Sequence, residues 1–161
     1  PVRSKRNVLG LASIETKPKI LGLLSRKMTE AKILFIGQER SKIAQERNVY
    51  WEDEAQCANQ LFRALRANKI DPNNCNFVNL FTDESDGVKY KEKSINQSGL
   101  NKIKKWKGYL VGMGNLVQQK LCELNIKHIE IIHPAARGAI RLKENYIRHI
   151  KENLKNVLTK G

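Results

Sequence analysis

The chain alternates four short apolar runs with longer polar or helix-patterned segments, and this alternation strongly constrains its fold. The runs are rich in β-branched and aromatic residues and fall at 32–36, 76–81, 108–113 and 127–132. The first run is apolar on both faces, as is typical of strands buried in a parallel sheet. Strands that alternate with helices form a parallel sheet covered on both faces. We therefore predict an α/β fold, a three-layer αβα sandwich with a four-stranded parallel sheet, in a single domain covering residues 1–161.

Helices are expected around and between the strands, with polar loops where no apolar period is present. The clearest helix is 52–68, where apolar residues recur every three or four positions and form one stripe. Asn115 is the expected N-cap of the helix that follows the third strand. Polar loops are expected at 37–49 and 83–100, and a turn at 71–74. The remaining expected helices are 20–28, 100–107, 115–124 and 138–158.

The net charge of the chain is +14, from 30 Lys and Arg against 16 Asp and Glu. The excess is concentrated in segments 1–32, 87–108 and 133–161, and it begins with a basic arm over about residues 1–18. Such a balance indicates a polyanionic partner, either nucleic acid or an anionic membrane surface. We expect DNA, double- or single-stranded, and no membrane partner, because no apolar stretch approaches spanning length.

The three cysteines, Cys57, Cys75 and Cys122, are scattered and show no CxxC pair. Their odd number argues against a disulfide framework, and their spacing fits no zinc or iron–sulfur site. We therefore predict free thiols in a reducing compartment, cytoplasmic or nuclear, with no metal and no cofactor. A monomer is expected.

Polar groups that could carry chemistry follow the first and last strands. The first strand runs into Gly37-Gln38-Glu39-Arg40, and the last ends at His133-Pro134, where proline stops the ladder. In open α/β sheets ligands bind beyond the carboxyl ends of the strands. Glu39 could activate water or stabilise a cationic sugar, and His133 could stabilise an oxyanion. The alternative for Glu39 is a solvated loop carboxylate. The alternative for His133 is a histidine whose hydrogen bonds are satisfied at a strand end.

Three further residues could recognise a nucleobase. Tyr50 and Trp51 are adjacent aromatics before a helix and could stack on a base, although at least one could instead belong to the core. Asn79 ends the second strand, and its side-chain amide offers a donor and an acceptor to a base edge. A turn-initiating asparagine is the alternative for Asn79.

Taken together, these motifs resemble the uracil-DNA glycosylase superfamily over roughly residues 32–155. Members have a first strand ending in Gly-Gln-Asp-Pro or Gly-Glu-Ala-Pro and a last conserved strand ending in His-Pro-Ser. The matching positions here are 37–40 and 133–135. The family's base-stacking aromatic matches Trp51 or Tyr50, and its base-reading asparagine matches Asn79.

The resemblance implies a DNA glycosylase that flips a damaged or modified pyrimidine and hydrolyses its N-glycosidic bond. Glu39 and His133 would be catalytic, and Gly37, Gln38, Tyr50, Trp51 and Asn79 would bind the base. The expected DNA contacts are Arg40, just after the first strand, and five residues of the charged segments, Lys104, Lys105, Arg137, Arg141 and Lys143.

Two alternatives remain open at this point. Arg40 stands where the family has proline and Ala135 where it has serine, so a catalytically inactive nucleic-acid-binding module on the same fold is the second hypothesis. The third is that Pro1, as a secondary amine, forms a Schiff base with the sugar.

Overall fold

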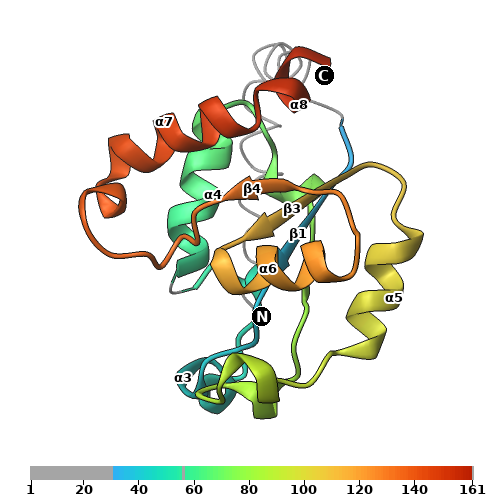
Figure 1. The fold of residues 1–161 in the computed structure, drawn as a ribbon. Helices are drawn as coiled ribbons and strands as arrows, with labels where there is room; N and C mark the ends of the chain where they lie inside the picture. Colours follow the sequence, from blue (N-terminus) through green and yellow to red (C-terminus); the bar gives the residue numbers. More distant parts are fainter. Residues whose placement is uncertain (1–30, 56, 161) are drawn as a thin grey trace, which may run out of the picture.

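The fold is built around a four-stranded, all-parallel sheet with strand order β2-β1-β3-β4. The computed structural model describes residues 31–55 and 57–160, and Figure 1 shows how their helices surround the sheet. The predicted α/β class and four-stranded parallel sheet are confirmed. The strands are β1 (Ile33–Gly37), β2 (Asn76–Asn79), β3 (Tyr109–Met113) and β4 (Ile129–Ile131).

Strand β1 lies at the centre of the sheet and is buried along its whole length. It pairs with β2 through Gly37 and Asn79 at one end, and with β3 through Ile33 and Tyr109 at the other. A strand that is apolar on both faces needs a cover on each side, which explains why helices flank both.

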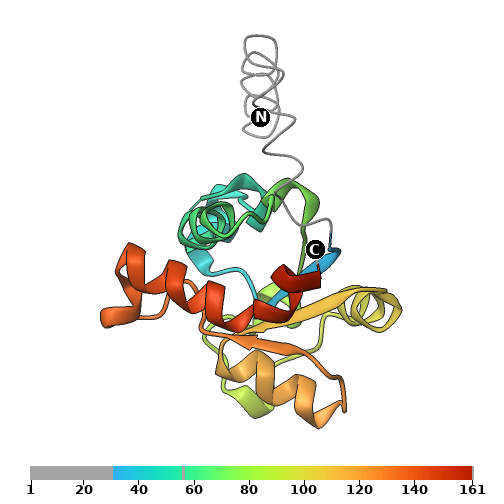
Figure 2. The ribbon, with the colours of Figure 1, turned by 90° about the horizontal axis from the view of Figure 1, so that it is seen from above.

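Two apolar cores separate the sheet from its helical layers, giving the expected three-layer sandwich. One core packs α4 and α7 against one face of the sheet, and the other packs α5 and α6 against the opposite face. Figure 2 shows α4 and α6 on opposite sides of the strands. The long helices are α4 (Cys57–Ala67), α5 (Gln97–Lys105), α6 (Asn115–Glu123) and α7 (Lys143–Asn153), and α7 is followed by the short α8 (Lys155–Lys160).

The apolar stripe predicted for 52–68 is confirmed in α4, where Leu61, Phe62 and Leu65 are buried. The predicted start was wrong, because Trp51–Asp53 forms a 3₁₀ turn that ends at Glu54 in the left-handed region, and α4 begins at Cys57. A left-handed residue reverses the chain direction and separates the two elements.

The segment 37–49, predicted as a loop, contains the short helix α3 (Lys42–Arg47). The Ser41 side chain accepts a hydrogen bond from the Ala44 amide, and Asn48 ends the helix in the left-handed region. Capping residues at both ends thus stabilise a helix that has only one buried side chain, Ala44.

Other predicted boundaries also shift. The N-cap of α6 is Gly114, with φ of 91°, and not Asn115. The segment 83–100 holds two 3₁₀ turns, at Asp83–Ser85 and Tyr90–Glu92, before α5 begins. The helix predicted at 138–158 is divided into a 3₁₀ turn at Ala139–Arg141 followed by α7 and α8.

Some predicted features lie outside the residues that the structure describes, and others can be compared with it. The helix predicted at 20–28, the basic arm and Pro1 lie outside them. The predicted free thiols are confirmed for Cys57, Cys75 and Cys122. Among the described helices none has the length and apolar character needed to cross a bilayer.

Candidate functional site

A cavity of about 590 Å³ opens at the carboxyl ends of the strands, where the sequence predicted a site. The pairing of Gly37 with Asn79 brings the ends of β1 and β2 together, and His133 follows β4 at the same edge of the sheet. Eight predicted site residues line this cavity: Gln38, Glu39, Arg40, Tyr50, Trp51, Asn79, His133 and Arg141.

Gly37 lies against two side chains of the cavity wall, and a side chain at this position would displace them. A Cβ at this position would lie 2.9 Å from Asn79 Oδ1 and 3.0 Å from Trp51 Cζ2. The indole Nε1 of Trp51 donates a hydrogen bond of 3.0 Å to Asn79 Oδ1. Gly37 therefore supplies the space in which the aromatic and amide side chains meet.

Trp51 is a fixed wall of the cavity. Its ring stacks on Phe77 with centroids 6.1 Å apart, and meets the His133 ring edge-on at 6.0 Å. The hydrogen bond from the indole also fixes which way the Asn79 amide points, so that oxygen faces Trp51. The Asn79 Nδ2 group makes no hydrogen bond to another described residue, and it retains two N–H donors for a ligand.

His133 is held as a neutral imidazole with its proton on Nε2. The backbone amide of Ala135 donates a 3.0 Å hydrogen bond to Nδ1, so Nδ1 is the acceptor of the ring. Burial lowers the pKa of His133 from 6.5 to about 4. At neutral pH, Nε2 therefore offers an N–H donor without a positive charge.

The last residue before His133 is fixed by α7. The Ile132 amide donates to His149 Nε2 at 2.8 Å, and the Tyr146 hydroxyl donates to the Ile132 carbonyl at 2.7 Å. Both backbone polar groups at the end of an edge strand are thereby satisfied by side chains. No contact of this kind was predicted from the sequence, although Tyr146 and His149, three residues apart, are polar groups on the apolar stripe of a helix.

Glu39 is buried in an ion pair with Lys93. Their side chains are 6% and 4% exposed, and Lys93 Nζ lies 2.8 Å from Glu39 Oε1 and 2.9 Å from the Ser85 carbonyl. Burial raises the pKa of Glu39, while Lys93 acts in the opposite direction. Glu39 is one of the residues that line the cavity, and one of its carboxylate oxygens is held by Lys93. No feature of the polar sequence 83–100 predicts Lys93 as the partner of Glu39.

Arg40 is neutralised within the protein. Its guanidinium donates three hydrogen bonds to Asp83, two to Oδ2 at 2.7 and 3.2 Å and one to Oδ1 at 3.4 Å. It also lies 4.4 Å from the centre of the Tyr50 ring. The half-exposed Tyr50 is thus covered by Arg40 on one face. Arg40, predicted as a DNA contact, is positioned as a partner of Asp83 that shapes the cavity wall.

The other predicted DNA contacts separate into two groups. Arg137 is exposed on the segment that joins His133 to α7, and Lys143, also exposed, is the first residue of α7, two positions after Arg141. Lys104 and Lys105 end α5, which leads directly into β3, so they lie at the edge where the strands begin. The structure therefore does not bring them to the cavity. Arg63, which the sequence analysis did not single out, lines the cavity from α4.

Comparison with known proteins does not extend this description. The sequence matches no protein-family model, and no curated protein sequence is significantly similar to it.

The Glu39–Lys93 pair can be tested by its contribution to stability. Lys93→Met leaves a buried carboxylate without its cation and is expected to lower the free energy of unfolding by about 3–5 kcal/mol. Adding Glu39→Gln to Lys93→Met should restore much of that loss, because no charge then remains buried. Urea denaturation checks both values. As a matched control, Lys120→Met removes a more exposed pair, with Glu123, and should change stability little. Equal effects of the two Lys→Met changes would contradict the burial argument.

The depressed pKa of His133 predicts a loss of stability in acid. Since the folded-state pKa is about 4 and the unfolded value is 6.5, the neutral form favours folding, fully above pH 6.5 and progressively less below it. Between pH 7.5 and pH 5 this one group should cost about 2 kcal/mol. The measurement is urea denaturation at both pH values for wild type and His133→Gln. The variant should lose less stability in acid, and an unchanged pH dependence would contradict the prediction.

Proposed function

We propose that this protein is a DNA glycosylase-like hydrolase, related to the uracil-DNA glycosylase superfamily, that flips a damaged or modified pyrimidine and hydrolyses its N-glycosidic bond. The observation that carries the proposal is the neutral His133, with its Nε2–H available beside Trp51 and Asn79 in one cavity. A cavity of about 590 Å³ has the size typical of small-ligand sites.

The role of His133 follows from its protonation state. When the N-glycosidic bond breaks, its electron pair stays with the base, which leaves as an anion whose charge reaches its carbonyl oxygens. A neutral N–H donor can stabilise that charge by hydrogen bonding and does not have to release its proton. Because α7 holds Ile132 through His149 and Tyr146, the donor is positioned before the reaction begins.

Recognition of the base falls to Trp51 and Asn79. The Asn79 amide is oriented by Trp51, so its N–H groups can donate to a carbonyl on the Watson–Crick edge of a flipped pyrimidine. Trp51 stacks on Phe77 and provides an aromatic wall. Tyr50, exposed and covered on one face by Arg40, offers the second aromatic surface near the entrance.

Glu39 is proposed to stabilise the cationic sugar and to accept the proton of the attacking water. The oxocarbenium-like sugar carries positive charge, which a nearby carboxylate stabilises, and water then adds to the anomeric carbon and loses a proton. Burial, which raises the Glu39 pKa, makes the carboxylate a better proton acceptor, and Lys93 fixes its position.

The exposed cationic side chains around the cavity bind the phosphates of DNA in this proposal. Arg137, Arg141 and Lys143 follow the His133-Pro134 strand end, in a loop, a 3₁₀ turn and the first turn of α7. Contacts from such side chains to phosphates release counterions, so binding should weaken steeply with salt.

The Glu39–Lys93 pair also favours a second candidate, a nucleic-acid-binding module without catalysis. One carboxylate oxygen is already occupied by the ammonium group. In that case the same basic surface and base-binding wall would hold a flipped or single-stranded base without cleaving it.

The two candidates are separated by a base-release assay on oligonucleotides that carry uracil or other altered pyrimidines, single- and double-stranded. The glycosylase proposal expects free base from at least one substrate. His133→Ala should slow release by about 10²–10³-fold, the usual effect of losing one donor to a developing anion. Glu39→Gln should also slow release, and neither change should weaken DNA binding, which is measured by fluorescence anisotropy.

A matched pair of double variants controls for charge. Arg137→Ala with Arg141→Ala, and Lys104→Ala with Lys105→Ala, each remove two positive charges. Only the first pair lies near the cavity, so only that pair should weaken DNA binding strongly. No free base from any substrate at high enzyme concentration, with DNA binding intact, would reject the glycosylase and leave the binding module.

A further inference from the structure

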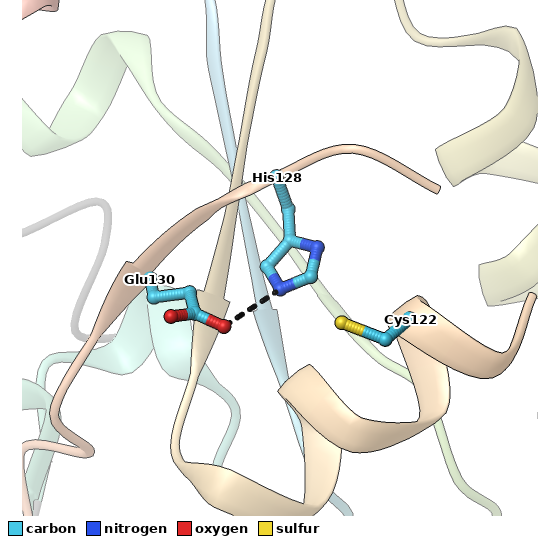
Figure 3. Close-up of side chains that lie close together, drawn as sticks. All are labelled: Cys122, His128 and Glu130. Carbon is cyan, nitrogen blue, oxygen red and sulfur yellow. Dashed lines mark ion pairs between the residues drawn. The ribbon is translucent and has the colours of Figure 1, made fainter. Parts of the chain in front are cut away.

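Three side chains with metal-binding atoms gather between α6 and β4, on the side of the sheet that packs α5 and α6. Cys122 lies on α6, His128 lies just before β4, and Glu130 lies on β4 (Figure 3). Their ligand atoms all lie within 4.8 Å of one another. None of the three lines the cavity at the strand ends, so this cluster is a separate feature.

His128 is oriented so that its Nε2 atom can bind a metal ion. Its Nδ1 lies 2.9 Å from the Ile126 carbonyl, an acceptor only, so Nδ1 carries a proton and, in the neutral ring, Nε2 presents a lone pair. The side chain is 4% exposed, and Nε2 has no hydrogen-bond partner among the described residues. A backbone carbonyl that holds the second ring nitrogen is the usual support of a metal-binding histidine.

The neighbouring strand leaves room for the imidazole. A Cβ on Gly112 of β3 would lie 2.9 Å from His128 Cδ2, so any larger residue would displace the ring. Gly112 is paired in register with Glu130. His128 and Glu130 are two residues apart in an extended segment and therefore point to the same face, toward α6.

The separations fit a metal after a small adjustment. His128 Nε2 lies 3.6 Å from Glu130 Oε2, which is too long for a hydrogen bond. Metal–ligand lengths of about 2.0–2.2 Å in a tetrahedral site would place these atoms about 3.3 Å apart. Cys122 and Glu130 are both exposed and can rotate toward His128, which is fixed.

We propose that Cys122, His128 and Glu130 form a zinc-binding site. A thiolate, an imidazole and a carboxylate are the ligand types that Zn²⁺ accepts, and three protein ligands leave a fourth position open to solvent. Binding ties the edge strand β4 to α6. The thiol proton of Cys122 is released to solvent when the metal binds.

Cobalt(II) titration of the reduced 161-residue protein tests the proposal, because a thiolate ligand gives Co²⁺ a near-ultraviolet charge-transfer band. One equivalent of Co²⁺ should produce the band, and Zn²⁺ should abolish it by displacement. Cys122→Ser should remove the band, whereas the matched control Cys57→Ser should retain it. Glu130→Gln should weaken Co²⁺ binding about 10-fold or more, in line with losses at metal sites.

The two exposed variants keep the test independent of folding. His128→Ala removes a buried ring and could unfold the chain, whereas Cys122 and Glu130 are exposed and their variants should retain the wild-type circular dichroism. His133→Ala should leave the cobalt band unchanged, since His133 belongs to the cavity at the strand ends. Absence of a band in the wild-type protein, or a band that survives Cys122→Ser, would overturn the proposal and leave His128 and Glu130 as a simple ion pair.

Discussion

The arrangement of this protein depends on the complete burial of β1. All five residues of this strand are buried, and both of its edges are paired in parallel, with β2 and β3. Parallel pairing places the carboxyl ends of the strands at one edge of the sheet, where loops and helix starts converge. Glu39, Asn79 and His133, at the ends of β1, β2 and β4, therefore meet around one cavity, although 40 positions separate the first two and 54 the last two.

Around that cavity the polar side chains are held by partners within the protein. Trp51 orients Asn79, the Ala135 amide sets the tautomer of His133, and Lys93 holds Glu39. Such prior positioning is what an electrostatic site needs, because groups that are already oriented do not have to reorganise during the reaction. The proposed hydrolase chemistry rests on this fixed geometry, above all on the neutral N–H of His133.

The sequence predicted the strands well because their signal is local: short β-branched runs bounded by Gly and Pro. It also predicted that Glu39, Asn79 and His133 would share a site, since each follows or ends a strand. Trp51 was added to that site by the family resemblance. It could not reveal Lys93 as the partner of Glu39, because that contact joins residues 54 positions apart through a polar segment. The hydrogen bonds of Ile132 with Tyr146 and His149 also join distant residues. The cluster of Cys122, His128 and Glu130 could not be predicted for a similar reason. In that cluster a thiol on a helix meets two side chains of the β4 segment only after α6 packs on the sheet.

Helix α3 was missed for a different reason, since its caps stabilise a segment that lacks an apolar period.

Nitrogen NMR of the His133 side chain across a pH titration tests the neutral donor directly. At pH 7 the proton should be on Nε2 with Nδ1 unprotonated, and the ring should become charged only as the pH falls to about 4. A proton on Nδ1 at neutral pH, or titration at the ordinary value near 6.5, would contradict the neutral donor on which the proposed function rests.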